Sequence, residues 1–494
     1  MKIRHEIASP LATAADLWVV CAPGQADKAP EFRALDAATG GRLKAQVKAE
    51  GFSGNPGETL IAYRNGDGGH LALLGVGPGP QTPAAVRDAA AEAAKLGTRL
   101  GARSVGFAVG PGQDGAMVAY QGALGARLGL YRFDRYLSAN GAKKPPQTFI
   151  IATPAPARAR TKPTRQTAAV RRAEAVADAV CLARDLVNEP AGAMTPKDMA
   201  AQARKIARGA GLTATVHDRK AVEKLGMGLY LAVARGSAEE PRLIHITYKP
   251  KKKAKKVVAL IGKGVTFDSG GYSLKPSASM LEMKCDMAGA AAVISTMTAL
   301  AAVDCPHEVH AVCACAENML SGDAYRLGDV LRSMDGTTVE INNTDAEGRL
   351  TLADALTYAR TRIKPDEMFD FATLTGACTI ALGPYTAGVM TNRDELARTW
   401  LDAARTAGED MWPLPLIDRL TEQLKSPIAD CRNTGERRGG AITAGLFLRQ
   451  FVKDIPWVHV DIAGPAFMSR DVGGALGQGG TGFAVATLAE YLSR

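Results

Sequence analysis

Four carboxylates lie in or beside glycine-bearing segments in the second half of the chain: Asp268, Asp286, Asp345 and Glu347. Carboxylate oxygens are the ligands that hard divalent cations prefer, and a pair of such ions needs several bridging carboxylates to offset its charge. Asp345 and Glu347, two positions apart, point the same way in extended backbone, so both could reach one pair of metal ions. The alternative is that these acids are solvated or cap helices, with Asp345 as the residue that could cap the helix expected over 349–362.

Three cationic residues accompany the acids: Lys263, Lys275 and Arg349. The glycines around the two lysines allow the backbone to pack closely around a ligand. A lysine held against metal ions loses its proton easily and becomes a ligand itself, whereas a neighbouring lysine that keeps its charge can stabilise an oxyanion. The alternative is that these side chains are solvated on the surface.

Other catalytic and nucleotide-binding patterns are missing from the sequence. His307-Glu-Val-His310 lacks the spacing of HExxH, which needs two histidines on one helix face, so we expect a structural role. Gly75-Val-Gly77-Pro-Gly79 departs from the dinucleotide fingerprint and is expected to be a loop. Neither a GxSxG elbow nor a GxxxxGK[ST] loop occurs.

The elements that must position these residues are those of an α/β protein. Strands are expected at 257–261, 308–315, 339–341, 368–373 and 458–462, and helices over 288–303, 349–362 and 442–452. Both acidic clusters follow an expected strand, where ligand sites of open α/β sheets gather. The front of the chain alternates short strands with helices over 83–100 and 116–131.

We therefore expect two α/β domains joined by a helix: a smaller N-terminal α/β domain over 1–153, a Pro-rich basic linker with a connecting helix over 154–188, and a larger catalytic domain over 189–494. The larger domain should hold a central mixed sheet flanked by helices.

Composition fits a soluble globular protein of 494 residues, with 46% hydrophobic and 22% charged residues. The eight cysteines form no CxxC pair, which indicates a reduced, cytoplasmic protein rather than a disulfide framework. No apolar run approaches the ~20 residues that span a bilayer, and no signal-cleavage pattern follows Met1, so we expect no membrane segment.

Net charge is +10, and residues 1–165 carry nearly all of it, with 21 Lys and Arg against 12 Asp and Glu. The remainder has 39 against 38. A basic front segment favours acidic partners, so nucleic-acid binding stays open as an alternative or additional function.

The motifs closely resemble those of the cytosolic leucyl aminopeptidase family, which are two-metal exopeptidases. The resemblance rests on Gly262–Gly271, Met283-Lys-Cys-Asp-Met287 and above all Asn343-Thr-Asp-Ala-Glu-Gly-Arg-Leu350, with support from Ala316-Glu-Asn-Met319 and His459-Val-Asp-Ile-Ala-Gly464. It covers roughly residues 170–494. The chain departs from the commonest family text at Tyr272, Cys285 and Ala288, none of which is a ligand position.

The resemblance implies a role for each matching residue. One metal ion would be held by Lys263, Asp268, Asp286 and Glu347, and the other by Asp268, Asp345 and Glu347. Lys275 would stabilise the tetrahedral intermediate, Arg349 would hold a bicarbonate ion that shuttles protons, and Met283, Thr373 and Gly376 would line the pocket for the first side chain.

The resemblance further implies a metal-dependent aminopeptidase of the cytoplasm that releases leucine and similar N-terminal residues from peptides. Two divalent ions, Zn²⁺, Mn²⁺ or Mg²⁺, would activate a shared water. A homohexamer is also implied. A two-metal phosphohydrolase is a third interpretation, disfavoured because Lys263 stands at a ligand position and no glycine-rich phosphate loop is present.

Overall fold

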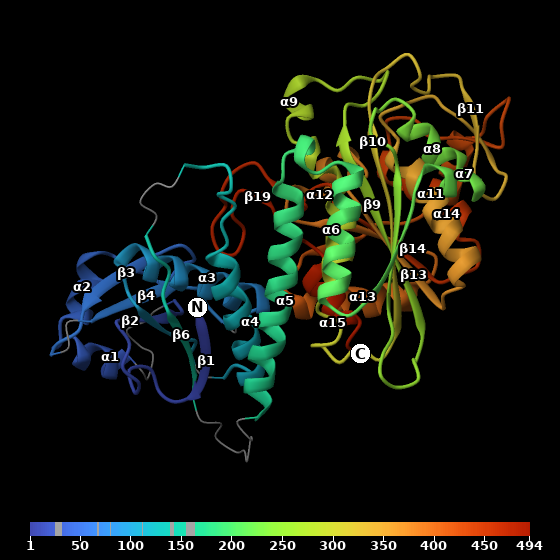
Figure 1. Cartoon of the computed structure of the whole chain (residues 1–494). Coiled ribbons are helices and arrows are strands. Elements are labelled where there is room, and N and C mark those ends of the chain that lie inside the picture. The colour runs from blue at the N-terminus through green and yellow to red at the C-terminus, as the bar shows by residue number, and fades with distance from the viewer. Residues whose placement is uncertain (25–31, 67–68, 80, 111, 139–142, 155–163) are drawn as a thin grey trace. The chain divides into compact units, whose positions relative to one another are not determined.

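The computed structural model describes residues 1–24, 32–66, 69–79, 81–110, 112–138, 143–154 and 164–494 (Figure 1). The described residues form two compact units, one of 1–177 with 471–477 and the other of 178–470 with 478–494. Most of the predicted Pro-rich linker, 155–163, lies outside the described residues. No helix among the described residues combines the length and the apolar character needed to cross a bilayer.

The first unit is built on a six-stranded sheet of order β1-β6-β5-β2-β4-β3, parallel except for the pairing of β3 with β4. Its elements are β1 (Lys2–Ile7), β2 (Leu17–Ala22), α1 (Phe32–Ala38), α2 (Leu43–Ala49), β3 (Thr59–Tyr63), β4 (His70–Gly75), α3 (Pro83–Leu100), β5 (Ser104–Ala108), α4 (Gly115–Gly129) and β6 (Thr148–Thr153). The predicted alternation of strands and helices is confirmed.

Local signals explain where the helices begin and end. α3 begins after Thr82, whose hydroxyl accepts a hydrogen bond from the Ala85 N–H, and ends at Gly101 in the left-handed conformation. In the second unit, Thr195 and Asp198 form a capping box at the start of α6 (Pro196–Gly209). The long helix α5 (Thr164–Asn188) matches the connecting helix expected there.

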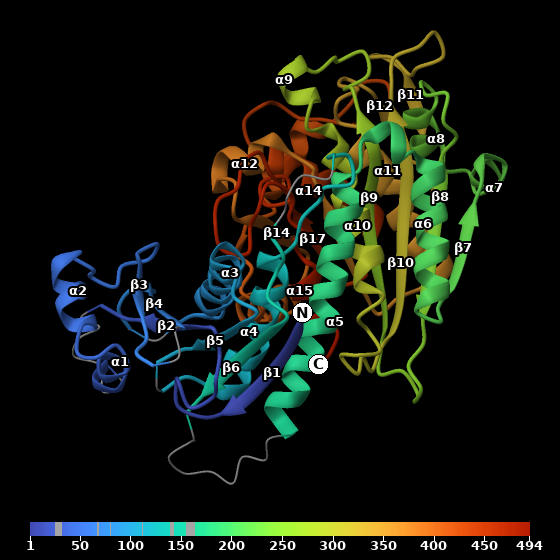
Figure 2. The same ribbon diagram turned by 60° about the vertical axis from the view of Figure 1, so that its left-hand side comes forward.

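The second unit is built on an eight-stranded mixed sheet of order β15-β14-β17-β13-β9-β10-β8-β7 (Figure 2). The strands are β7 (Thr213–His217), β8 (Arg242–Tyr248), β9 (Val257–Asp268), β10 (Glu308–Asn318), β13 (Glu367–Ala372), β14 (Ala387–Thr391), β15 (Met411–Pro413) and β17 (Trp457–Asp461). The four central strands, β17, β13, β9 and β10, run parallel, so their carboxyl ends share one edge.

Helices and short elements surround this sheet. The helices are α7 (Arg219–Lys224), α8 (Gly228–Ala234), α9 (Ser277–Met280), α10 (Ala288–Thr296), α11 (Gly348–Tyr358), α12 (Gly376–Leu382), α13 (Asp394–Ala407), α14 (Gly440–Val452) and α15 (Val485–Tyr491). The short elements are η2 (Ala191–Ala193), β11 (Val330–Arg332), β12 (Thr338–Glu340), η4 (Ala359–Ile363), η5 (Asp418–Leu424), β16 (Cys431–Arg432), β18 (Phe467–Met468), β19 (Gly479–Gly480) and η3 (Met283–Met287).

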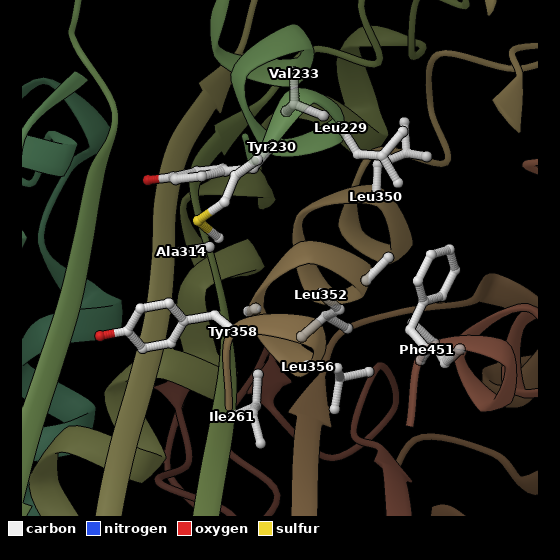
Figure 3. Close-up of a cluster of buried hydrophobic side chains, with 14 of the residues drawn as sticks. Leu229, Tyr230, Val233, Ile261, Ala314, Leu350, Leu352, Leu356, Tyr358 and Phe451 are labelled. Atoms are coloured by element: carbon white, nitrogen blue, oxygen red, sulfur yellow. The ribbon is translucent and has the colours of Figure 1, made fainter. Parts of the chain in front are cut away.

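The apolar core of the second unit lies between one sheet face and the helices α8, α11 and α14. Figure 3 shows part of it, including Leu229 of α8, Leu356 of α11 and Phe451 of α14. Ala259 and Ile261 of β9 point into this core. Because side chains alternate along a strand, Lys263 lies on the same face, where α11 begins.

Two expectations need correction. The strand expected over 257–261 continues to Asp268 in β9, because Gly262 and Gly264 allow close contact with Ala290 of α10 and with β10. The helix expected over 288–303 ends as a regular helix at Thr296, and turns follow.

Candidate metal centre

The predicted acidic residues converge at the shared carboxyl edge of the parallel strands. Asp268 is the last residue of β9, Asn318 ends β10, Asp461 ends β17, and Thr373 directly follows β13. Ligands of open α/β sheets bind at this edge. The 341–350 segment and η3 bring the remaining acids to it.

Lys263 joins two of the carboxylates. Its Nζ lies 2.7 Å from Oδ1 of Asp286 and 2.8 Å from Oε1 of Glu347, and it donates to the carbonyl of Thr373 at 2.9 Å. The lysine is 3% exposed and Glu347 is 1% exposed. A side chain at position 348 would collide with Lys263, since a Cβ there would lie 2.5 Å from its Cε. Gly348 therefore makes room for the buried lysine.

Lys275 joins the other two acidic side chains. Its Nζ lies 2.9 Å from Oδ2 of Asp268 and 2.6 Å from Oδ1 of Asp345. The backbone turn between β9 and Lys275 depends on Gly270, which has φ +84°. A Cβ added at this position would lie 2.5 Å from the Ser273 carbonyl oxygen. Lysines and carboxylates thus alternate across the site.

Asn318 fixes the orientation of Asp268. Its amide donates to Oδ1 of Asp268 and to the carbonyl of Thr344, both at 2.9 Å. The Gly270 N–H also donates to the same Oδ1 at 2.8 Å. No role was predicted for Asn318, although it stands in the Ala316–Met319 segment that supports the resemblance.

Burial and mutual repulsion set the electrostatics. Desolvation, followed by the nearby Glu347 carboxylate, raises the pKa of Asp268. Desolvation also raises the pKa of Asp286 well above its usual range. Burial alone would lower the pKa of Lys263, but the carboxylates of Asp286 and Glu347 outweigh it and raise that pKa. The site therefore concentrates negative charge that requires cations nearby.

The donor set fits a divalent cation. Asp268, Asp286 and Glu347 each offer an oxygen within 4.8 Å of the others, and all three are buried. Oδ2 of Asp286 and Oε2 of Glu347 are buried without a hydrogen-bond partner among the described residues. Buried polar atoms are normally satisfied, so two unpartnered oxygens on residues of this cluster are suited to an ion.

Arg349 is buried at the start of α11. Its Nη1 donates to the Asn433 carbonyl at 2.9 Å, and its Nε has no partner among the described residues. Desolvation lowers the pKa of the guanidinium to about 10, against the opposing effect of Glu347. The guanidinium keeps its charge at neutral pH and has a donor available for an anion.

All ten predicted site residues line one cavity of about 530 Å³. Met283 and Gly376 lie on its walls together with Ala377 and Ala463. Thr373 donates its hydroxyl to Oδ1 of Asp286 at 2.7 Å, which links the wall to the acidic cluster.

Asp461 holds the turn that follows β13. Its Oδ1 accepts from the N–H groups of Leu374 and Ala463 at 3.1 Å, and its Oδ2 accepts from the Thr375 hydroxyl at 2.7 Å. This residue lies in the His459–Gly464 segment of the resemblance, but its contacts could not be predicted from the sequence.

The alternative of solvated or helix-capping acids is wrong for Glu347. It occupies the residue before α11, but its side chain makes no capping hydrogen bond and is buried against Lys263. Its backbone is helical, with φ −72° and ψ −35°, rather than extended as the i, i+2 argument assumed. The two acids therefore contact different lysines: Asp345 pairs with Lys275, and Glu347 pairs with Lys263.

A parallel-sheet edge carrying buried carboxylates, two lysines and an adjoining cavity fits a metal-dependent hydrolase. Residues 181–489 match the catalytic domain of the cytosol aminopeptidase family, and residues 19–140 match the N-terminal domain of the same family. The chain belongs to the cytosol aminopeptidase family and is an aminopeptidase. The match over 19–140 extends the resemblance into the front of the chain.

Similar proteins cover nearly the whole chain. A probable cytosol aminopeptidase of Syntrophotalea carbinolica is 43% identical over 480 residues, which is 94% of each protein. Among solved structures, a tomato leucine aminopeptidase mutant has a TM-score of 0.90 at 35% identity and covers 100% of this chain and 96% of its own. The bottromycin maturation enzyme BotP in complex with Mn has a TM-score of 0.85 at 40% identity, covering 97% and 99%.

Proposed function

We propose that the 530 Å³ cavity is the active site, and that the enzyme releases leucine and similar N-terminal residues from peptides. The observation that carries this proposal is the buried cluster of Asp268, Asp286 and Glu347, whose oxygens converge within 4.8 Å. The catalytic domain is assigned to 189–494, preceded by the connecting segment 154–188 and the N-terminal domain 1–153.

Two divalent ions are assigned to this cluster. Lys263, Asp268, Asp286 and Glu347 would hold one, and Asp268, Asp345 and Glu347 would hold the other, so Asp268 and Glu347 would serve both. To serve as a ligand, Lys263 would give up the proton that the carboxylates of Asp286 and Glu347 hold on it here, because a cation in the cluster disfavours the ammonium. Such ions supply Lewis acidity and lower the pKa of a shared water. Oxygen and amine ligands accept Zn²⁺, Mn²⁺ or Mg²⁺, and the manganese complex of BotP supports a divalent ion of this kind.

Lys275 is assigned the stabilisation of the negative charge that develops on the carbonyl oxygen. Burial alone would lower the pKa of Lys275, but Asp268 and the other carboxylates outweigh it and raise that pKa, so the ammonium stays protonated. Its side chain is 16% exposed and lines the cavity, which allows contact with a bound peptide. A charged donor held in this way acts most strongly where water is excluded.

Arg349 is assigned to a bicarbonate ion. The support is a buried guanidinium at the cavity wall whose Nε has no partner among the described residues. Arg349 would hold the anion through this donor, and a bound bicarbonate would supply a proton-accepting oxygen at the cavity wall. Met283, Thr373 and Gly376 are assigned to the wall that receives the first side chain.

The assembly and location follow from the family resemblance. A homohexamer and a cytoplasmic location are part of this proposal. Nucleic-acid binding by the basic front segment stays a prediction, with the 21 cationic residues of 1–165 as its support.

An aminopeptidase requires a free α-amine on its substrate, and this requirement distinguishes it from other hydrolases. The manganese-loaded enzyme should hydrolyse leucyl p-nitroanilide and should lose at least 100-fold in kcat/KM towards the N-acetylated substrate, because the acetyl group removes the amine that the ions would receive. Release of nitroaniline gives both rates. Equal cleavage of the two substrates would contradict an exopeptidase.

A further inference from the structure

The parallel sheet of the first unit contains its own crevice. β2 and β5 are neighbours, and the chain leaves them for α1 and α4. Phe32 of α1 packs with Trp18 of β2, which shares its sheet face with Gly106. Gly122 of α4 contacts Ile151 of β6, which belongs to the opposite face. α1 and α4 therefore cover opposite faces of the sheet. The place where two neighbouring strands send their helices to opposite faces is a topological switch point, and it opens a crevice at the carboxyl ends of β2 and β5.

A cavity of about 340 Å³ lies at this switch point. Cys21 and Ala22 end β2 beside it, Val76 follows β4, Val109 follows β5, and Pro154 follows β6. The volume lies within the range of small-molecule sites. All described lining residues belong to the first unit, whereas every residue of the metal centre belongs to the second.

The described part of the lining is mostly apolar. Phe32, Leu35, Val20 and Leu73 form part of the wall, and no Asp, Glu, Lys, Arg or His is found among the described residues that line the cavity. A buried charge without a partner is strongly unfavourable. Amino acids and peptides are zwitterions, and the described lining offers no partner for either of their charges.

The helix beginnings near the cavity are also unsuited to a phosphate. The N-cap of α4 is Asp114, whose carboxylate accepts from the Ala116 N–H. Thr82 similarly caps α3 through the Ala85 N–H. At α4 the Asp114 carboxylate would repel an anion, and at α3 the Ala85 N–H is already bonded to Thr82. Neither helix start therefore favours an anion.

Polar groups in the lining are confined to a few side chains. Gln81 donates to the carbonyls of Gly77 and Gly79, which fixes its amide beside the cavity. Gln113 contributes a second amide from the segment after β5, and Ser9 a hydroxyl. Amides both donate and accept, so they suit a ligand with one or two neutral hydrogen-bonding atoms.

We propose that this cavity is a second ligand site, which binds an uncharged aromatic small molecule with a neutral hydrogen-bonding end. The ring contacts Phe32 and Leu35, where a flat apolar surface packs against the aromatic side chain. The hydrogen-bonding end meets the amides of Gln81 and Gln113.

The test uses N-phenyl-1-naphthylamine, an uncharged aromatic amine that fluoresces strongly in apolar surroundings, with the full-length protein. The expected result is saturable binding with one site per chain that leucine and leucylglycine do not displace. Val76→Trp should weaken this binding at least tenfold, because the indole fills the cavity. Ile61→Trp places the same ring at a half-buried position of β3, outside the lining and outside the apolar cluster of Phe32 and Leu35, and should leave binding unchanged.

Gln113→Trp is a second filling variant, used if Val76→Trp fails to fold as judged by circular dichroism. Non-saturable fluorescence with the unaltered protein would overturn the proposal. Equal affinity in the filled and control variants, or displacement by leucylglycine, would place the probe elsewhere and overturn it as well.

Discussion

Asp354 is a carboxylate buried away from the metal centre, inside α11. It accepts hydrogen bonds from the Tyr230 N–H at 2.9 Å and the Met334 N–H at 2.8 Å, so it ties α8 and the β11–β12 region to α11. Desolvation raises its pKa to about 7, against the lowering effect of these hydrogen bonds. The Asp354 carboxyl group thus binds its proton more tightly in the folded protein than in the unfolded chain.

The consequence is a stability that depends on pH. Because the folded pKa is the higher one, this contribution is fully present below about pH 4 and is lost as the pH rises through 7. The free energy of unfolding of the second unit should fall by roughly 2–3 kcal/mol between pH 5 and 8 through this group. Urea unfolding followed by tryptophan fluorescence measures it.

Asp354→Asn should remove most of this pH dependence, since the amide does not titrate. The exposed Asp323→Asn is the matched control and should retain the full fall. An Asp354→Asn protein that shows the same fall as the unaltered protein would contradict the assignment.

The side chains of the site could be predicted from residue type and motif, whereas their contacts could not. Lys263 and Asp286 are 23 positions apart, and only the fold places their atoms 2.7 Å apart. Asn318 and Asp461 were not predicted to support the site, because a neutral amide and a carboxylate at strand ends show no distinctive spacing. Their roles depend on strand order.

The turn after β13 is the element that connects the cavity wall to the acidic cluster. Asp461 holds Leu374 and Thr375, while the preceding Thr373 bonds to both Asp286 and Lys263. A shift of this turn would therefore move a candidate metal ligand and the substrate wall together. Displacements near 1 Å cost about 100-fold in rate in well-positioned active sites.

Asp461→Asn should lower kcat/KM for leucyl p-nitroanilide by about 10- to 100-fold, because an amide nitrogen replaces one accepting oxygen and loosens the turn. Circular dichroism should remain unchanged. Asp430→Asn is the control, since Asp430 accepts from the Thr338 N–H and hydroxyl in the same manner, outside the cavity lining. Equal effects of the two substitutions would contradict a specific role of the turn.

Elements were predictable where periodicity was strong, as in α3, which was expected over 83–100 and is found at Pro83–Leu100. The continuation of β9 through Gly262-Lys-Gly264 was not, because glycine weakens strand propensity in general. Here the glycines permit contacts with Ala290 and Cys315 that only the tertiary fold supplies. Tertiary packing thus overrides the local signal.

At the scale of the whole molecule, two parallel-sheet edges carry two different chemistries. The edge in the second unit is acidic and lysine-rich, and the edge in the first unit is apolar and uncharged among the described residues. Sequence motifs revealed the first because its polar residues are distinctive. The apolar cavity gave no such signal, because valine, leucine and phenylalanine at strand ends are typical of any core.

The central claim is that hydrolysis depends on divalent ions held by the acidic cluster. The most direct test is the hydrolysis of leucyl p-nitroanilide by metal-stripped protein, with and without Mn²⁺ or Zn²⁺. Activity should be absent after stripping, return with metal, and fall at least 100-fold in Asp345→Ala but not in the exposed control Asp323→Ala. Metal-independent cleavage, no cleavage with any metal, or full activity of Asp345→Ala would contradict the account.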